Sequence, residues 1–351
     1  MESADRPDPG RASELHDILG QSKAGLALNL KAPGALDAAK ALVARSDIVV
    51  ENFAPGVMER LGLGYPALRE VQPDVVLLSA SGLGQTGPDA NKVAYGALLQ
   101  CFTGFATLNG FPGRLPASGM AWADPLCGLV LAFAAVAALR DRDATGRGRH
   151  IDFSMVEALL STMPGPLLDY QIGGAAPGPR GNDDATHSPH GVFRCAGGDA
   201  WIAIAVTSDD EWRSLCGEVE SLATLDALDA GERRLRSDEI DAALREWALP
   251  LDAGEAMHRL QSAGVPASAS FSSTELFDDP HLRARGFYRA VTYADGAERV
   301  LPGLPWRWGD GSLFEPARAP ALGGDTDRVL RDVLGLSEGE IEKLRTAGAL
   351  S

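Results

Sequence analysis

Hydrophobic residues recur at helical spacing and in short runs along the first part of the chain. Residues 34–45 carry apolar side chains at helical spacing, and the run Ile48–Val50 that follows predicts a short strand. A loop at Asn52–Gly56 and two short helical stretches then lead to a second strand-like run at Val75–Ser79. Strands that alternate with helices indicate β-α-β units and a parallel sheet.

Two longer apolar segments follow, at residues 125–140 and 152–163, and both predict helices. The longest apolar run, Cys127–Leu139, is too short to span a bilayer, which takes about 20 residues. It therefore predicts a buried helix. Residues 173–190 are rich in Gly, Pro and polar residues, which is typical of a linker or a domain boundary.

The pattern changes after this linker. Residues 191–206 form two apolar runs around a Gly-Gly-Asp turn, which predicts a β-hairpin. Polar helices are expected from Asp209 to Ser262, short strands and loops over residues 265–310, and a last helix over Ser337–Ala347. The second part of the chain therefore predicts a mixed α and β structure.

Composition limits the classes of function. The chain has 351 residues, of which 45% are hydrophobic and 23% charged, enough for one large domain or two. Its net charge of -16 repels nucleic acids and anionic membranes, so we exclude both as general partners. An anionic small ligand stays compatible with this charge, but it would need a few well-placed Lys or Arg side chains.

The cysteines and the N-terminus indicate a compartment. Cys101, Cys127, Cys195 and Cys216 lie far apart, without a C-x-x-C motif or metal-ligand spacing, so no metal site is predicted. Scattered thiols of this kind fit a reducing cytoplasm. The acidic, proline-containing start of the chain is the reverse of a secretory signal. We therefore expect a cytoplasmic protein.

Residues 82–87, GLGQTG, have the G-x-G-x-x-G form of a dinucleotide-binding loop and follow the apolar run Val75–Leu78. A true fingerprint needs a helix that starts within the motif, and an acidic residue about 20 positions later. Here the turn-like residues PDANK follow, and no Asp or Glu occurs between Asp89 and Asp124. By itself the motif predicts a glycine-rich turn after a strand.

Longer stretches around this turn resemble a known family. The first is DIVVENFAPGVMERLGLGYPALREVQPDVVLLSASGLGQTGP, and the others are AYGALLQCFTGF, GFPGRLPASGMAWADPLCG, AALRDRDATGRGRHIDFSMVEALL, PRGN and SPHGVFRCAGGDAWIAIAV. Weaker similarity continues through DDPHLRARGF and LGGDTDRVLRDVLGLS. Together they resemble the class III CoA-transferase family, also called the carnitine dehydratase and bile-acid-inducible protein F (CaiB/BaiF) family.

The resemblance implies an α/β fold with a large doubly wound, Rossmann-like domain and a smaller α+β domain. The expected domains are residues 1–188, which bind CoA and carry the catalytic Asp, residues 189–300, and a segment at 301–351 that returns to the large domain. Chains of this family interlace as dimers, so we expect a homodimer and leave a heterodimer open. The substrates implied are an acyl-CoA and a carboxylic acid acceptor, with no metal.

By the family pattern, Asp124 in the segment WADPLCG is the catalytic residue. A carboxylate is ionised at neutral pH without a general base, so it can attack a thioester carbonyl and expel CoA thiolate. An acyl-aspartyl anhydride results, and the acceptor acid takes over through a second anhydride. From the residues alone, an Asp before a Pro and an apolar helix predicts a helix N-cap, and both roles can coexist.

The same pattern implies a CoA-binding set. Arg60 and Lys23 would supply positive charge, although each is otherwise a solvated surface charge. Phe53 and Tyr95 would pack on the nucleotide or the pantetheine, although each is otherwise a core aromatic residue. The complete implied set is Lys23, Asn52, Phe53, Arg60, Lys92 and Tyr95.

Two departures from the family pattern affect the function. Racemases of the family need a His near position 95 or 96, where this chain has Tyr95 and Gly96, so an acyl-CoA racemase or epimerase is a disfavoured second hypothesis. Some members also carry a polyglycine lid after the Arg-Gly-Asn step, which residues 183–189 replace. His187 and His190 in this region could contact an acceptor, or be ordinary exposed histidines.

The start of the chain is a third departure. Family members open with a strand-helix-strand unit, and from the resemblance we expect this unit to be missing, because the sequence begins at Met1 directly before the segment that would follow it. A third hypothesis is therefore a non-catalytic or truncated partner subunit of a CoA-transferase complex. The presence of Asp124 argues against that hypothesis. The donor and acceptor acids are not determined by the sequence.

Overall fold

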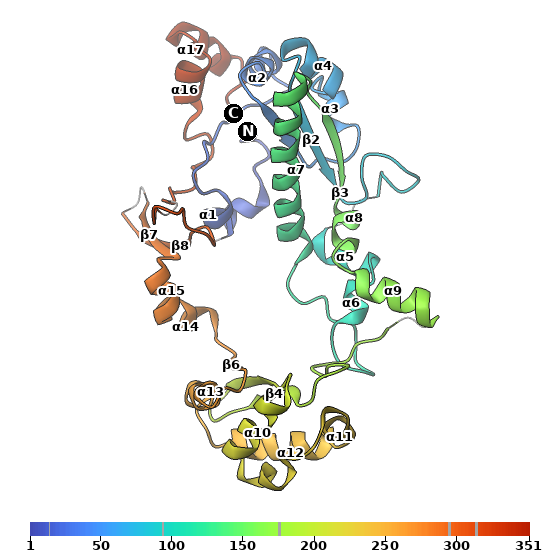
Figure 1. Ribbon diagram of the computed structural model, residues 1–351. Helices are drawn as coiled ribbons and strands as arrows, with labels where there is room; N and C mark the ends of the chain where they lie inside the picture. The colour runs from blue at the N-terminus through green and yellow to red at the C-terminus, as the bar shows by residue number, and fades with distance from the viewer. Residues whose placement is uncertain (14, 93–94, 175–176, 294–295, 313–314) are drawn as a thin grey trace. The chain divides into compact units, whose positions relative to one another are not determined.

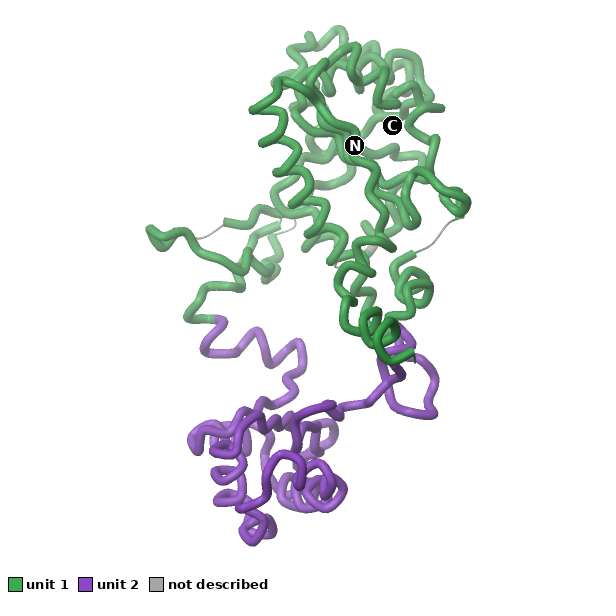
Figure 2. The backbone as a smooth tube through the Cα atoms, turned by 45° about the vertical axis from the view of Figure 1, so that its right-hand side comes forward, with its two compact units in different colours: residues 1–105, 118–175, 283–351 green, residues 106–117, 176–282 purple. Residues whose placement is uncertain are grey.

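The computed structural model describes residues 1–13, 15–92, 95–174, 177–293, 296–312 and 315–351 (Figure 1). The chain forms two compact units, coloured green and purple in Figure 2. The first contains residues 1–105, 118–175 and 283–351, and the second contains residues 106–117 and 176–282. These units are groups of residues in mutual contact, so the domain limits at residues 188 and 300 remain a prediction.

A parallel sheet lies at the centre of the first unit, as the alternation of strands and helices predicts. Within the described residues its strand order is β1-β2-β3. The strands are β1 (Ile48–Glu51), β2 (Val76–Ser81) and β3 (His150–Ser154). Since β2 has a strand on either side, all of its residues are buried.

Helices cover both faces of this sheet. Val75 and Leu77 point to one face, where they pack with helices from both ends of the chain. Val76 and Leu78 point to the other face, where they pack against Ala138 of α7 (Ala123–Thr145), which runs beside the strands in Figure 1. The helices on the first face are α2 (Ala35–Val43), α3 (Val57–Arg60), α4 (Tyr65–Val71), the π-helix η3 (Val329–Val333) and α17 (Glu338–Thr346).

The helix expected over residues 152–163 is wrong in its first part. Residues 150–154 form β3, because their backbone pairs with β2 from Leu77 to Ser81. Only then does α8 (Met155–Leu160) begin, where the Ser154 hydroxyl accepts a hydrogen bond from the Glu157 N–H at 3.3 Å. Sheet pairing therefore overrides the apolar helical pattern in this segment.

The helix expected at Cys127–Leu139 is confirmed, but its expected burial is wrong. This segment belongs to α7, whose buried residues are Ala123, Cys127 and Ala138, while Phe133 is 75% exposed. By length and composition α7 could cross a membrane, but a single helix of this kind is weak evidence for a membrane protein. In the isolated chain α7 therefore has an uncovered apolar side.

The two ends of the chain meet in the first unit. Glu2 forms a parallel bridge with Ala27, and the Ala27 N–H donates to the Thr326 hydroxyl at 2.9 Å. A hairpin of β7 (Tyr288–Thr292) and β8 (Glu298–Pro302) also belongs to this unit. The first unit also contains η1 (Pro9–Ala12), α1 (Leu15–Leu19), α5 (Gly96–Phe102), α9 (Pro164–Gly173) and α16 (Thr326–Arg328). The helices α6 (Phe105–Leu108) and α15 (Pro280–Arg285) contain the limits between the two units, and α14 (Ser273–Asp278) belongs to the second unit.

The second unit is an antiparallel sheet packed against helices, and it contains the predicted hairpin. The strands are β4 (His190–Arg194), β5 (Trp201–Ala205) and β6 (Ala267–Ala269). Its core surrounds the fully buried Trp212 and Phe193. The helices that cover the sheet are α10 (Asp209–Glu218), η2 (Glu220–Leu225), α11 (Ala230–Leu235), α12 (Ser237–Ala248) and α13 (Ala253–Ser262), which confirms the helical stretch predicted from Asp209.

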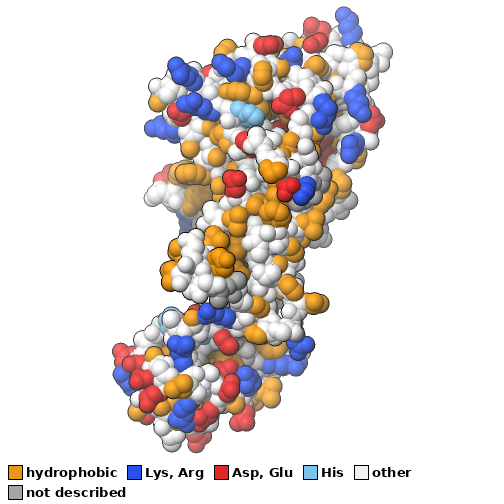
Figure 3. All heavy atoms as spheres, turned by 90° about the vertical axis from the view of Figure 1, so that its right-hand side faces the viewer, with side chains coloured by type: hydrophobic (Ala, Val, Ile, Leu, Met, Phe, Trp, Pro, Cys, Tyr) orange, Lys and Arg blue, Asp and Glu red, His pale blue; other side chains and the backbone are white. Residues whose placement is uncertain are grey.

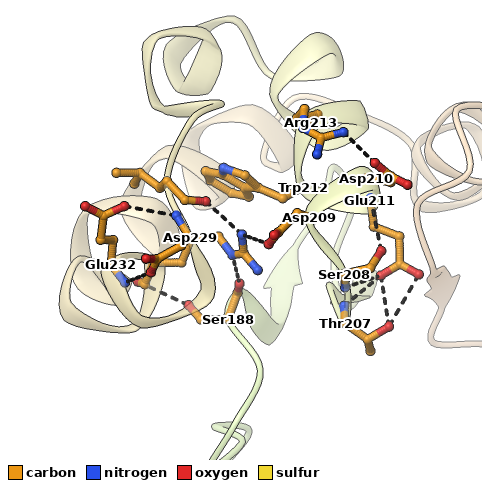
Figure 4. A network of polar contacts seen from close by, with 12 residues as sticks. Ser188, Thr207, Ser208, Asp209, Asp210, Glu211, Trp212, Arg213, Asp229 and Glu232 are labelled. Atoms are coloured by element: carbon orange, nitrogen blue, oxygen red, sulfur yellow. Dashed lines mark hydrogen bonds and ion pairs between the residues drawn. The ribbon is translucent and has the colours of Figure 1, made fainter.

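A buried arginine ties this core together. Arg233 donates to the carbonyls of Ser188 at 3.0 Å and Leu228 at 2.9 Å, and to the Asp209 carboxylate at 2.8 Å. Its guanidinium also lies over the Trp212 ring. Figure 4 shows Ser188, Asp209 and Trp212 converging on this network. The network therefore anchors the entry to β4 on the helices.

Candidate active site

Asp124 lies exposed in the first turn of α7. The helix begins at Ala123 with Trp122 before it, so the expectation that Asp124 is the N-cap is wrong. The Asp124 carboxylate lies against Gly96, the first residue of α5. A Cβ on Gly96 would stand 2.1 Å from Oδ2 and 3.0 Å from Cγ of Asp124. Only a glycine at position 96 leaves room for the carboxylate in this position.

A small apolar cluster packs beneath the start of α7, where α5, α7 and α8 meet. Leu99 of α5, Ala123 of α7 and Leu159 of α8 are fully buried in it. Leu83, from the glycine-rich turn after β2, packs against the same cluster. Asp124 therefore lies close to the end of β2, where open parallel sheets bind their ligands.

The next strand of the sheet contributes a loop at the same edge. Asn52 and Phe53 directly follow β1, and β1 runs parallel to β2 beside it. The buried Glu51 carboxylate accepts the Phe53 N–H at 2.8 Å, which holds the loop against the strand. Phe53 is 48% exposed, so the alternative that it is a core residue is wrong.

Arg60 lies near the loop after β1, and Tyr95 lies near Asp124. The Arg60 side chain is exposed, and its Nη1 would lie 3.1 Å from a Cβ on Gly56, so it folds back over the loop that carries Phe53. Tyr95 is 75% exposed and directly precedes Gly96, so it is not a core aromatic residue either. Its backbone therefore leads directly into the Gly96–Asp124 contact.

The two lysines of the expected set have other contacts. Lys92 forms an exposed ion pair with Asp89 at 2.9 Å. Lys23 donates from Nζ to the Leu19 carbonyl at the end of α1. The structure therefore groups Asn52, Phe53 and Arg60 together and Tyr95 with Asp124, but the contacts of Lys23 lie with α1.

The G-x-G-x-x-G turn is closed by a carboxylate. The Gln85 N–H donates to Oδ1 of Asp152 at 2.7 Å, and the Thr86 hydroxyl donates to Oδ2 at 3.3 Å. Gly84 and Gly87 have positive φ angles, which only glycine adopts without strain. The next helix, α5, starts only at Gly96. A turn amide bonded to a carboxylate disfavours a phosphate at the same position, in agreement with a structural turn.

Cys127, one turn after Asp124 on α7, is not a candidate nucleophile. Burial of Cys127, together with the nearby charge of Asp124, raises the pKa of its thiol to about 11. Its Sγ donates to the Met155 carbonyl at 3.6 Å. Because the thiolate is the nucleophilic form of cysteine, Cys127 is inert at neutral pH.

His187 and His190 belong to the second unit. Nδ1 of His187 lies 2.9 Å from Oδ1 of Asp184. Nδ1 of His190 lies 2.7 Å from the Asn182 carbonyl. His187 is half-buried in the loop before β4, whereas His190 is the exposed first residue of β4. Both side chains have local hydrogen-bond partners, and these contacts assign neither of them a role with an acceptor.

Sequence reasoning did not identify three residues of this site. They are Gly96, which accommodates Asp124, Glu51, which holds Phe53, and Gln100, whose side chain bonds to the chain before Asp124. The family resemblance marked the segments that contain them, but pairwise contacts between α5 and α7 have no signal in one sequence.

The fold and the sequence of this chain are similar to those of known proteins. A CaiB/BaiF family protein from Brucella suis has a similar structure, with a TM-score of 0.85 and 24% identity over 95% of this chain and 90% of that one. The succinyl-CoA–L-malate CoA-transferase alpha subunit of Chloroflexus aurantiacus is 34% identical in an alignment that covers 87% of this chain and 72% of that protein. The formyl-CoA:oxalate CoA-transferase of Rhodopseudomonas palustris is 31% identical in an alignment that covers 95% of this chain and 83% of that protein.

The family model for CoA-transferase family III matches residues 2–326. This range contains the parallel sheet, Asp124 with its neighbours, and the whole second unit. The chain therefore belongs to CoA-transferase family III and is a transferase.

Proposed function

We propose that this protein moves CoA from an acyl-CoA thioester to a carboxylic acid, with Asp124 as the covalent nucleophile. The observation that carries the proposal is the exposed Asp124 carboxylate, which lies against Gly96 next to the end of β2. The carboxylate is exposed, so a thioester can reach it, and the buried Gly96 lies against its other side. The names of the relatives support the reaction class, since both are CoA-transferases.

The proposed reaction has four steps, and CoA thiolate leaves or attacks in each of them. An oxygen of Asp124 attacks the thioester carbon, the C–S bond breaks, and CoA thiolate leaves an acyl-aspartyl anhydride. The thiolate attacks the aspartyl carbonyl, the anhydride C–O bond breaks, and an aspartyl-CoA thioester forms as the donor acid leaves. The acceptor carboxylate then expels the thiolate again and forms a second anhydride. Finally the thiolate attacks the acceptor carbonyl, which yields the new thioester and restores Asp124.

CoA itself would lie along the edge formed by the ends of β1 and β2. Phe53 offers an exposed aromatic face for the adenine, with Asn52 beside it, and Arg60 offers a charge for the phosphates. Tyr95 would contact the pantetheine close to Asp124. Lys92 and Lys23 complete the proposed set.

Lys92 needs only a small rearrangement to take part. Its exposed ion pair with Asp89 stabilises the protein by about 1 kcal/mol or less, so a CoA phosphate can replace Asp89 at little cost. Lys23 needs a larger change, because its ammonium is bonded to the end of α1. We therefore assign Lys23 the weakest contribution to CoA binding.

The racemase hypothesis gains no support from the site. That reaction needs a second base facing Asp124, and Gly96, which lies against the carboxylate, has no side chain to supply one. Tyr95 before it carries a phenol and not the imidazole that racemases of the family use as their second base. CoA transfer, which needs only the carboxylate, fits these residues better.

We further propose that the chain works as an interlaced homodimer in the cytoplasm. Leu129, Phe133 and Val136 leave an apolar side of α7 exposed, and Figure 3 shows hydrophobic side chains gathered on one face of the first unit. Apolar surface of this kind favours association. A heterodimer remains the alternative, since similar chains in Chloroflexus aurantiacus are named alpha and beta subunits. Light scattering of the purified protein distinguishes a monomer from a dimer.

The decisive experiment traps the intermediate. Incubation with an acyl-CoA and hydroxylamine should place a hydroxamate on Asp124, detected by peptide mass spectrometry. Asp124→Ala should abolish transfer across a panel of dicarboxylic, aromatic and steroid acids. Asp143→Ala, an exposed aspartate at the far end of the same helix, is the matched control and should keep full activity. Transfer by Asp124→Ala above about a hundredth of the wild-type rate would refute the mechanism.

A further inference from the structure

Helix α5 presents one buried face to the start of α7. Gly96, Leu99 and Gln100 form this face, with the spacing of neighbours on a helix surface, and all three are buried. Leu99 packs with Ala123 in the cluster below the site. The other two residues of this face contact the start of α7 directly. Gln100 bonds to the backbone before Asp124, and Gly96 lies against the Asp124 carboxylate itself.

Gln100 bonds to the chain segment that leads into α7. Its side chain is 0% exposed, its Nε2 donates to the Ser118 carbonyl at 2.6 Å, and its Oε1 accepts the Trp122 N–H at 2.9 Å. A carbonyl can only accept and an N–H can only donate, so these partners fix the orientation of the amide. Both polar ends of a buried side chain are thus used on one short segment.

This segment has little other support. Residues 119–122 are exposed, and the Trp122 N–H that Gln100 binds is shared with the Met120 carbonyl at 2.8 Å. The amide of Gln100 therefore determines where the chain enters α7. Because Asp124 follows two residues after Trp122, the direction of its side chain depends on that entry.

Gly96 limits the carboxylate from the other side. A Cβ at this position would lie 2.1 Å from Oδ2 of Asp124, well inside van der Waals contact. The backbone of Gly96 thus acts as the wall against which the carboxylate rests. Any larger residue would turn the carboxylate away from its present position.

We propose that Gln100 and Gly96 are positioning residues for Asp124, one fixing the backbone that carries it and the other leaving the space for its carboxylate. The inference rests on the proposed role of Asp124 as nucleophile. A nucleophile must approach the thioester carbon in a narrow range of distance and angle, and a displacement of about 1 Å can cost about 100-fold in rate. Neither residue touches the substrate in this account.

Kinetics of three variants test the inference. Gln100→Leu removes both hydrogen bonds at similar volume, and Gly96→Ala adds the conflicting methyl group. Both should lower kcat by about 10- to 100-fold while the Kd for free CoA changes less than about threefold. The matched control is Cys101→Ser, on the exposed side of α5, which should keep kcat within about twofold.

A second readout does not depend on activity. In the wild type, Gly96→Ala forces its new methyl group onto the carboxylate, whereas in Asp124→Ala that carboxylate is absent. Gly96 does not have a positive φ angle, so alanine there mainly restricts the unfolded chain; Gly96→Ala should raise Tm in the Asp124→Ala background and raise it clearly less in the wild type, where the methyl group displaces the carboxylate. Equal shifts in the two backgrounds would overturn the contact.

The outcomes separate this inference from the proposed function. An active Asp124→Ala protein refutes the proposed function. An inactive Asp124→Ala protein together with unchanged kcat in Gln100→Leu and Gly96→Ala refutes only the positioning role. Should Gln100→Leu fail to fold, Gly96→Ala and the pair of Tm shifts decide the question.

Discussion

Replacing Arg233 with methionine should lower the free energy of unfolding of the second unit by about 2–4 kcal/mol. The Arg233 residue is 2% exposed, and its guanidinium donates to the carbonyls of Ser188 and Leu228. Leaving a largely buried carbonyl without its charged donor costs about 1–2 kcal/mol of stability, so the Ser188 and Leu228 carbonyls together account for the expected range. The Asp209 side chain is 58% exposed and adds little, because water replaces its partner.

Methionine is chosen because it keeps an apolar stem over the Trp212 ring and removes only the polar group. Urea unfolding followed by tryptophan fluorescence measures the loss, since Trp212 is buried beside the substituted residue. Arg213→Met is the matched control on α10. Arg213 pairs with Asp210 on the exposed side of the helix, so its loss should cost about 0.5 kcal/mol or less.

A third variant separates the two kinds of partner. Asp209→Asn keeps both carbonyl bonds of Arg233 and removes only the ion pair, so it should cost less than about 1 kcal/mol. If Arg233→Met is no less stable than Arg213→Met, the carbonyl bonds contribute nothing and the reasoning is wrong. If Asp209→Asn alone reproduces the full loss, the ion pair and not the carbonyls holds the network.

Three further predictions concern binding, pH and thiols. Arg60→Ala and Tyr95→Ala should each weaken binding of free CoA by about 10- to 150-fold in calorimetry, and unchanged Kd values in both would remove them from the site. The hydrogen bond from Arg11 lowers the pKa of Glu2, so this pair stabilises the fold above the ordinary carboxyl pKa and loses its effect as pH falls. Glu2→Gln should therefore lower Tm at pH 7, and the difference should shrink as pH falls through the lowered pKa of Glu2 and vanish below it; a difference that persists in strong acid would contradict this. In the native protein Cys101 should react with Ellman's reagent and the three buried thiols only in denaturant; rapid reaction of all the thiols would show that the buried ones are accessible.

Several elements could be predicted from the sequence because their signals are local. The apolar runs before Asn52 and before Gly82 predict β1 and β2, and turn chemistry with alternating residues predicts the β4–β5 hairpin. The motif around Asp124 and the order of its neighbouring segments indicated the family, which the family model confirms. In each case the information lies within a few consecutive residues or in the order of short segments.

Some local signals were present but outweighed. Ser154 and Glu157 have the S-x-x-E spacing of a capping box, which marks the start of α8, yet the apolar pattern suggested a helix already at residue 152. The strand β3 forms there because β2 offers an open edge for pairing. Strand formation depends on a partner that lies far away in the chain, so periodicity in one segment cannot reveal it.

The sequence by itself determined the alternation of strands and helices and the family, and it indicated Asp124 as the candidate nucleophile. Tertiary structure alone decided that Gly96 makes room for Asp124, that Gln100 holds the chain before it, and that Asp152 closes the glycine-rich turn. It also left α7 uncovered on one side, where an apolar sequence suggested burial. The physical reason is that local patterns encode which backbone conformation a segment prefers, whereas contacts between segments depend on how packed helices and strands meet in space.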